Sequence, residues 1–475
     1  MKSTTRAFKT QAKVALKDID LQRALAKAKG GFVDKRQAAI NGLPEFEQLR
    51  TIAREIKEHT LSHLDYYLEH FETRVRAYGG YVHWARTPDE ARRIVVDICR
   101  RADARRVTKG KSMVGEEIAI NEALESAGFE VIETDLGEYI IQLAKEPPSH
   151  IIAPAVHKTR DQITDLFHNH HRKYGLKDRV TEIPEIVNEA RQVLREGFLS
   201  ADVGITGANF LIAETGSTVI VTNEGNGDLT NTLPRVHIVT ASIEKVVPTL
   251  EDVATILRIL ARSATGQEMG SYTTFSTGPR RDGDRDGPEE FHVLLLDNGR
   301  SEMLGNEFRE MLRCIRCGAC LNHCPVYSSI GGHAYGWVYP GPMGSVLTPL
   351  MIGLKEAGHL PNACTMNGRC QEVCPMSIPL PKLLRSLRTR EYEERLTAAR
   401  MRLGLALWAF FARRAWLYRI AAGAMIRVLG LLGRKRGRFR FLPFARSWTR
   451  ARDLPAPGRQ TFQSAWRKTR GRNRE

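Results

Sequence analysis

The stretch Cys314-Ile-Arg-Cys317-Gly-Ala-Cys320-Leu-Asn-His-Cys324-Pro325 carries four of the eight cysteines of this chain of 475 residues. Its C-x2-C-x2-C-x3-C-P spacing is the bacterial ferredoxin pattern, in which the fourth cysteine binds a neighbouring cluster. Gly318 and Ala319 are small, so the backbone can approach a cluster closely. The stretch therefore predicts a module with two iron–sulfur clusters, and electron transfer is the first functional hypothesis.

A second run, Cys364-Thr-Met-Asn-Gly-Arg-Cys370-Gln-Glu-Val-Cys374-Pro375, carries Asn367 where a standard run would carry a cysteine. We expect the two runs to exchange ligands, with Cys374 serving the first cluster and Cys324 the second. The expected ligands of the first cluster, a [4Fe–4S] cluster, are Cys314, Cys317, Cys320 and Cys374. Those of the second cluster are Cys324, Cys364 and Cys370.

Asn367 leaves three thiolates for the second cluster. They suit a [3Fe–4S] cluster, or a [4Fe–4S] cluster with one non-cysteine ligand. We favour [3Fe–4S] because the C-x5-C-x3-C-P form resembles the three-iron site in iron–sulfur subunits of succinate dehydrogenases. Zinc fits a four-cysteine run with proline poorly, and disulfides require an oxidising compartment. Cys99 stands alone in an apolar helical stretch and is expected in the core.

Positive charge is concentrated at the C-terminal end of the chain. Residues 401–475 hold 19 arginines and lysines against two acidic residues, and their net charge of +17 equals that of the whole chain. The N-terminus lacks the apolar core of a signal peptide, and no uninterrupted apolar run reaches membrane-spanning length. We therefore expect a cytoplasmic protein, in which thiols stay reduced and clusters can be assembled.

The hydrophobic pattern divides the chain into four parts. Residues 1–78 have apolar residues at helical spacing and predict an N-terminal helical arm. Residues 79–300 alternate strand and helix patterns, which favours an α/β domain with a largely parallel sheet, and 150–154 is expected to be one of its strands. Residues 301–390 form the α-helical ferredoxin-like module, and 391–475 form a basic amphipathic C-terminal helix and tail.

Several motifs besides the first cysteine run are typical of one family. They are Gly79-Gly-Tyr-Val-His-Trp-Ala, Lys109-Gly-Lys-Ser-Met, Gly204-Ile-Thr-Gly-Ala-Asn-Phe, Ala213-Glu-Thr-Gly-Ser and Asn223-Glu-Gly-Asn-Gly. With these motifs the chain resembles the LutB/YkgF family, the iron–sulfur subunit of the bacterial L-lactate utilisation system, over most of residues 1 to about 385. The family usually has a cysteine at the position of Asn367.

The resemblance implies a lactate-utilisation (LUD) domain, similar to the NagB/RpiA/CoA-transferase fold, followed by a ferredoxin-like module with two iron–sulfur clusters. It also implies action with two partner proteins in the oxidation of L-lactate to pyruvate.

Two turns rich in small residues, at residues 109–113 and 204–209, are candidate ligand loops, and the loop at 214–217 is expected to meet them at the same sheet edge. Ligands bind at the carboxyl ends of parallel strands, where backbone N–H groups and a lysine can hold an anion. The alternative is that the glycines only make tight turns. A glutamate is the nucleophile of CoA-transferase relatives, but no activating base accompanies Glu214 in the sequence, so we expect a hydrogen-bonding role for it. The candidate loop residues are Lys109, Lys111, Gly204, Gly207, Glu214, Thr215 and Gly216; catalytic residues stay unassigned.

The basic C-terminal segment predicts contact with a membrane. From Met401 to Leu432 apolar residues alternate with arginines, and Trp408 and Trp416 add aromatic bulk. Basic amphipathic helices with such residues can lie on anionic membranes. We expect peripheral contact of residues 401–440 with the inner face of the membrane. The alternative is a helix packed on the body followed by a disordered basic end. Nucleic acid is not expected as a partner, because no recognition fold accompanies the charge.

These features together predict a non-catalytic electron-transfer subunit of an L-lactate dehydrogenase complex. It would act with other subunits of the lactate utilisation system and pass electrons through its two clusters towards a membrane acceptor. The alternative is a ligand-binding or acyl-transfer LUD protein whose clusters are structural or sense redox state.

Overall fold

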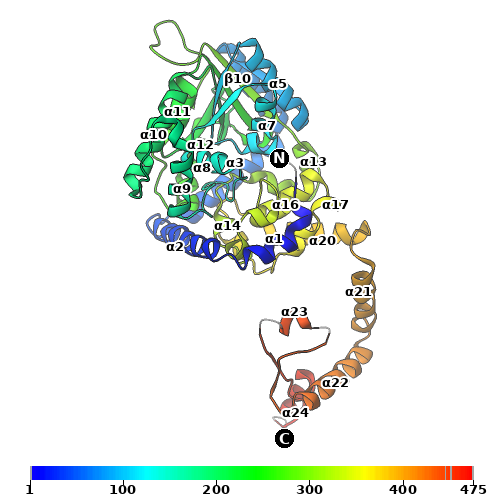
Figure 1. Cartoon of the computed structure of the whole chain (residues 1–475). Coiled ribbons are helices and arrows are strands. Elements are labelled where there is room, and N and C mark those ends of the chain that lie inside the picture. Colours follow the sequence, from blue (N-terminus) through cyan, green and yellow to red (C-terminus); the bar gives the residue numbers. More distant parts are fainter. Residues whose placement is uncertain (1–2, 444, 450–451, 473–475) are drawn as a thin grey trace. The chain divides into compact units, whose positions relative to one another are not determined.

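The structure, a computed structural model, describes residues 3–443, 445–449 and 452–472. The chain divides into two units, Met1–Glu391 and Tyr392–Glu475 (Figure 1). The first unit contains the main sheets and the cysteine runs, and the second contains the basic tail.

A six-stranded parallel sheet lies at the centre of the first unit, with the strand order β1-β10-β7-β4-β2-β3. Its central strands are buried along almost their whole length, as expected where helices cover both faces of a parallel sheet. The sheet confirms the predicted α/β class. Its strands are β1 (Tyr81–Ala85), β2 (Arg106–Gly110), β3 (Glu130–Glu133), β4 (Val203–Gly207), β7 (Val236–Ser242) and β10 (Glu290–Leu296).

Helices supply the apolar side chains that bury the two faces of this sheet. α5 and α7 pack on one face in a core that includes Cys99, which is fully buried as predicted. α4 packs on the other face. α5 begins where the Thr87 hydroxyl accepts a hydrogen bond from the backbone N–H of Glu90. The helices of this domain are α4 (Leu64–Ala77), α5 (Pro88–Arg101), α6 (Met113–Glu117), α7 (Ile120–Ser126), α8 (Leu136–Ala144), α9 (Arg160–His171), α10 (Ile183–Leu199) and α11 (Asn226–Thr232).

A smaller, four-stranded sheet has the order β8-β5-β6-β9. The segment that follows β4 turns out of the large sheet into this one, so the residues from Val203 to Thr222 form three strands in two sheets. α3 and α12 contact each other and pack beside the small sheet. Its strands are β5 (Phe210–Ile212), β6 (Ser217–Thr222), β8 (Val246–Val247) and β9 (Tyr272–Ser276), and the helices are α3 (Phe46–Ser62) and α12 (Leu250–Ala264).

The strand expected at residues 150–154 is wrong, because these residues form a loop. His150 is buried in it, with its Nε2 atom 3.1 Å from Oδ1 of Asn322 and its ring stacked on Phe32. A short apolar run predicts burial equally well for a strand and for a loop. Here burial comes from packing of the loop between the N-terminal arm and the cysteine module.

The N-terminal helices α1 (Phe8–Ala15) and α2 (Ile19–Asn41) contact the cysteine module. Arg36 on α2 donates to the backbone carbonyl of Val373 (2.9 Å), and Arg50 on α3 donates to that of Cys374 (2.8 Å). One hydrophobic core therefore runs through the arm, the small sheet and the cysteine module, which makes them a single unit.

Short helices build the cysteine module around its two loops. Leu380, Leu383 and Leu387 on α20 are buried in the same core. α14 and α15 contact α2, and α15 also contacts α1. The helices are α13 (Arg300–Leu304), α14 (Ala319–Asn322), α15 (Tyr327–Ile330), α16 (Gly341–Ile352), α17 (Leu354–Ala357), α18 (His359–Asn362), α19 (Arg369–Glu372) and α20 (Leu380–Glu393).

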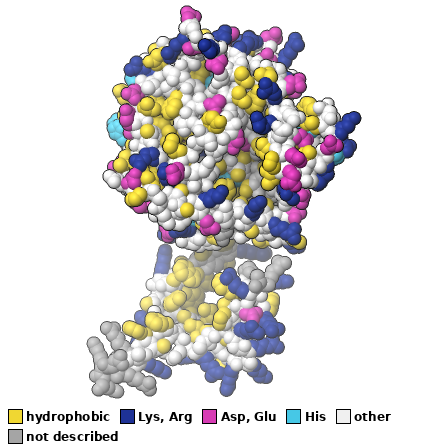
Figure 2. Space-filling model, turned by 90° about the vertical axis from the view of Figure 1, so that its left-hand side faces the viewer, with side chains coloured by type: hydrophobic (Ala, Val, Ile, Leu, Met, Phe, Trp, Pro, Cys, Tyr) yellow, Lys and Arg dark blue, Asp and Glu magenta, His cyan; other side chains and the backbone are white. Residues whose placement is uncertain are grey.

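The second unit exposes large apolar side chains among arginines, as Figure 2 shows. No residue of α21 is buried, and in α22 only Gly430 is. Among the described residues, α22 alone is long and apolar enough to cross a membrane. The elements are α21 (Ala399–Ala412), α22 (Ala415–Leu432), β11 (Arg438–Phe439), α23 (Arg446–Thr449), β12 (Leu454–Pro455) and α24 (Phe462–Arg472).

Candidate iron–sulfur site and the adjoining cavity

The two cysteine runs form loops with the same backbone shape. In the first loop, Arg316 (φ 58°) and Gly318 (φ 73°) have left-handed conformations; in the second, Met366 (φ 58°) and Gly368 (φ 83°) have them at the corresponding positions. Each glycine precedes a four-residue helix, α14 or α19. The runs are therefore a structural repeat, in which Asn367 takes the place of Cys317.

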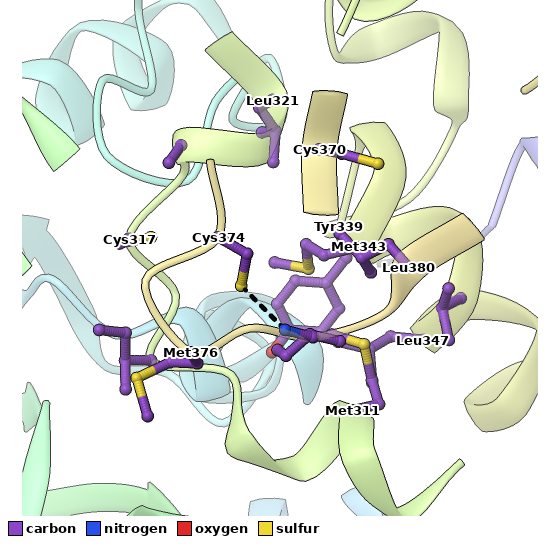
Figure 3. Packing of buried hydrophobic residues seen from close by; sticks show 14 of the residues in the cluster. Met311, Cys317, Leu321, Tyr339, Met343, Leu347, Cys370, Cys374, Met376 and Leu380 are labelled. Carbon is purple, nitrogen blue, oxygen red and sulfur yellow. Dashed lines mark hydrogen bonds between the residues drawn. The ribbon is translucent and has the colours of Figure 1, made fainter. Parts of the chain in front are cut away.

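The four cysteines assigned to the first cluster lie around one small cavity. Cys314, Cys317 and Cys320 line it from the first run, and Cys374 lines it from the second. Figure 3 shows Cys374 and Cys317 on separate loops, with the Cys374 sulfur accepting a hydrogen bond from the backbone N–H of Ile378 (3.5 Å). The fold thus brings together thiols that lie far apart in the sequence.

The three cysteines assigned to the second cluster also lie near one another. The pKa of Cys370 is raised to about 12. Burial is the largest cause, and the nearby charges of Cys364 and Cys324 add to it. Burial and the charge of Cys364 also raise the pKa of Cys324. Backbone N–H groups face two of these sulfurs, from Met366 to Cys364 (3.3 Å) and from Tyr327 to Cys324 (3.5 Å).

The chemistry of both cysteine sets fits iron–sulfur clusters. All the cysteines are free thiols. Burial raises the pKa of Cys317 and Cys320, so these thiols need a bound cation to lose their protons. N–H groups directed at sulfur are typical of cluster ligands. Which thiol binds which cluster stays a prediction.

Asn367 lies on the surface of the second loop, where its Oδ1 atom accepts a hydrogen bond from the backbone N–H of Arg369 (3.3 Å). The amide thereby stabilises the turn before α19. The second loop accordingly offers no thiol at position 367.

Two of the candidate loop residues serve the packing of the large sheet. Lys109 is fully buried and forms ion pairs with Glu116 and Glu133, both at 2.7 Å. Gly204 lies against α11 so closely that a Cβ atom there would be 1.8 Å from the carbonyl oxygen of Thr230. Neither residue lines the cavity that lies at the carboxyl ends of β2 and β4.

The turn between β5 and β6 also lies away from that cavity. Glu214 accepts a hydrogen bond from the backbone N–H of Leu250 (3.3 Å) at the start of α12. Thr215 donates to Ser217 (2.8 Å), and Gly216 packs against the backbone of Val75. Glu214 thus has the hydrogen-bonding role expected of it, and its position gives no support to acyl transfer.

Lys111 and Gly207 do line a cavity at the carboxyl ends of β2 and β4. Thr240 and Ser242 extend it along β7, and Arg316 and Cys317 of the first cysteine loop form part of its wall. Lys111 forms an ion pair with Asp135 (2.7 Å) across one side. The sheet-edge cavity predicted from parallel-strand geometry therefore borders the first set of cysteines, a contact that the sequence did not indicate.

A buried ionic network lies behind this wall. Arg300 forms ion pairs with Glu117 and Glu244, both at 2.8 Å, and Arg316 forms one with Glu244 (3.3 Å). The Tyr339 hydroxyl donates to Glu117 (2.6 Å). Burial opposes ionisation of Glu244, but the charges of Arg300 and Arg316 outweigh it and lower its pKa to about 2. This network fixes the position of Arg316 beside the cysteines.

Two family models match this chain, the LUD domain over residues 68–296 and the 4Fe-4S dicluster domain over residues 310–378. Its relatives include an electron transport protein, YkgF, of Escherichia coli, which is 43% identical over 471 residues and covers 98% of each chain. Lactate utilization protein B of Shouchella clausii is 43% identical (98% of this chain and 97% of the relative), and that of Bacillus subtilis is 41% identical (100% and 99%).

The chain belongs to the lactate utilization protein B family. It has the LUD domain followed by the ferredoxin-like dicluster domain of that family, and the dicluster match supports the presence of iron–sulfur clusters. A crystal structure of a DUF162 family protein from Deinococcus radiodurans covers 49% of this chain and 98% of its own, at 16% identity and a TM-score of 0.28.

Proposed function

We propose that this chain is the iron–sulfur electron-transfer subunit of a complex that oxidises L-lactate to pyruvate. It receives electrons from partner subunits and passes them through two clusters towards a membrane acceptor. The names of its relatives, lactate utilization protein B and electron transport protein, support a role in electron transfer during lactate utilisation.

The observation that carries this proposal is the convergence of two sets of thiols within a unit that also contains the LUD domain. Cys314, Cys317, Cys320 and Cys374 would hold one cluster, and Cys324, Cys364 and Cys370 the other. Clusters bound there would supply one-electron carriers. The protein's own contribution is to bury the sulfurs and to direct backbone N–H groups at Cys364 and Cys374.

A test of this function combines the purified, cluster-loaded chain with its partner subunits under anaerobic conditions. Addition of L-lactate should bleach the visible absorbance of the clusters, and an added quinone should restore it. D-lactate is the control for specificity. Clusters that stay oxidised in the complete complex, although dithionite reduces them, would refute the electron-transfer role.

For the cluster types we propose a [4Fe–4S] cluster at the first set and a [3Fe–4S] cluster at the second, because Asn367 replaces the thiol of the repeat. The oxidised protein should then give the sharp electron paramagnetic resonance signal close to the free-electron position that three-iron clusters show.

Asn367→Cys should convert the second cluster to [4Fe–4S], because it restores the thiol that Cys317 supplies in the first loop. The expected result is loss of the oxidised-state signal and gain of a reduced [4Fe–4S] signal. Thr365→Cys is a matched control, since it adds a thiol at an exposed position of the same loop. An oxidised wild-type protein without the three-iron signal would contradict the assignment.

We also propose that α21 and α22 attach the protein peripherally to an anionic membrane. Trp408 and Trp416 are 64% and 63% exposed, although each would favour an apolar environment. Arg413 and Arg414 lie between them and suit anionic headgroups. Attachment at this surface would bring the protein to a lipid-soluble acceptor.

The membrane proposal predicts that the full chain sediments with vesicles of phosphatidylcholine and phosphatidylglycerol, and not with phosphatidylcholine alone. Trp408→Ser combined with Trp416→Ser should weaken binding by at least about tenfold, since each indole contributes a few kcal/mol on burial. Trp466→Ser, which changes an exposed indole on α24, serves as control. Protein that resists extraction by carbonate would show that α22 spans the membrane instead.

A further inference from the structure

Two buried lysines near the first cysteine set differ in the hydrogen-bond partners of their ammonium groups. Lys57 and Lys245 are both buried, and burial lowers the pKa of each to about 8. Lys57 donates to the backbone carbonyls of Glu244 and Val246, the latter at 3.2 Å. For Lys245, no hydrogen bond or ion pair is present within the part of the chain that the structure describes.

The Lys245 side chain lines the cavity at the edge of the large sheet. Lys245 is 8% exposed, so its ammonium group keeps little of its hydration, which is costly unless an anion replaces the lost water. Lys57 avoids this cost through two carbonyls of its own chain. The position of Lys245 on the cavity wall therefore indicates that its partner is a molecule bound in the cavity.

Arg316 adds a second cation to the same wall. Its guanidinium lies 4.8 Å from the centre of the Tyr339 ring and forms its ion pair with Glu244, which holds the group in place. Cys317, the residue that follows Arg316, lines both this cavity and the cavity of the first cysteine set. A ligand bound at these cations would lie beside the first cluster.

The remaining lining shows what kind of anion the cavity suits. Val221, Leu260 and Ala264 give it apolar walls, and its two carboxyl groups, Asp135 and Glu138, both contact Lys111. Thr222 also lines it, and its buried hydroxyl has no hydrogen-bond partner among the described residues. Paired cations, an unpartnered hydroxyl and apolar walls suit an anion with a short carbon chain and a hydroxyl or carbonyl oxygen.

We propose that this cavity binds a small organic carboxylate, a 2-hydroxy or 2-oxo acid, with its carboxylate group at Lys245 and Arg316, beside the first cluster. The identification of the acid rests on the proposed function; the preference for a carboxylate rests on the cavity. No contact with α21 or α22 is involved, since every residue named here belongs to the first unit.

The test is isothermal titration calorimetry of the full-length, cluster-loaded protein under anaerobic conditions with L-lactate, pyruvate and inorganic phosphate. We expect saturable one-to-one binding of L-lactate or pyruvate. Lys245→Met should weaken it by about tenfold to a hundredfold, the effect of one charge-assisted hydrogen bond. Lys382→Met removes an exposed lysine outside the cavity lining and should leave binding within about twofold, by the general additivity of separate sites.

Thr222→Val is a second variant, which replaces the hydroxyl with a methyl group of similar volume and should weaken binding by about fivefold. Cluster absorbance confirms that each variant is folded. Absence of saturable binding, tighter binding of phosphate than of both acids, or unchanged affinity in Lys245→Met would overturn the inference.

Calorimetry of the isolated chain separates this inference from the proposed function. If the complete complex reduces the clusters with L-lactate while the chain alone binds neither acid, the inference fails and the electron-transfer role stands. If the chain binds an acid while the clusters stay oxidised in the complete complex, the electron-transfer role fails and the site stands.

Discussion

Replacement of Cys317 with serine is expected to remove the first cluster and to reduce lactate-dependent reduction of an acceptor to the background rate. Cys317 is buried and lines the cavity shared by the four thiols of the first set. A serine hydroxyl does not ionise readily at neutral pH, so it cannot replace the thiolate that binds iron. The iron and sulfide content should fall by the amount that one cluster contains.

Cys99→Ala is the matched control for this prediction. Cys99 is also buried, but it lies on α5 in the apolar core, and burial raises its pKa to about 12. This variant should retain the iron, the visible absorbance and the turnover of the unaltered protein. Full turnover in Cys317→Ser, or an iron loss of similar size in Cys99→Ala, would contradict the assignment of the first set.

Replacement of Arg300 with methionine is expected to destabilise the fold by about 3–5 kcal/mol. The substitution leaves the carboxylates of Glu117 and Glu244 buried without their shared partner. Burial would favour a neutral arginine, but the charges of these two glutamates raise the pKa of Arg300 well above its usual value. Urea unfolding of the cluster-loaded protein, followed by circular dichroism, measures the loss.

Arg280→Met is the control for an exposed ion pair. Its partner Glu289 lies at the same distance of 2.8 Å, but both side chains are about half exposed, and such pairs contribute at most about 1 kcal/mol. Combining Arg300→Met with Glu117→Gln and Glu244→Gln should recover part of the lost stability, because it removes the unpaired charges. Equal losses for Arg300→Met and Arg280→Met would show that the buried network has no such role.

The same network predicts how acid affects stability. The folded pKa of Glu244 is about 2 against an ordinary value of 4.5, so its ionised form stabilises the fold. That stabilisation is complete above about pH 4.5 and is lost as the pH falls towards 2, because the unfolded chain binds the proton first.

The sequence was sufficient to predict features that depend on local spacing. Cysteines separated by two to five residues lie on one loop whatever surrounds them, so the runs from Cys314 and from Cys364 predicted iron–sulfur chemistry and the missing thiol at Asn367. The alternation of strand and helix patterns likewise predicted the parallel α/β sheet. Cys99, in an apolar helical stretch, was predicted correctly as a core residue.

Only the tertiary structure showed what depends on the meeting of distant segments. The partners Glu117 and Arg300 are 183 residues apart, and Lys245 meets the loop of Cys317 through the packing of the small sheet against the cysteine module. Residues 150–154 have the composition of a strand but form a loop, and Glu214 lies away from the cavity at the sheet edge. Composition and periodicity record which residues prefer burial; which buried residues touch is decided by the energy of packing the whole chain.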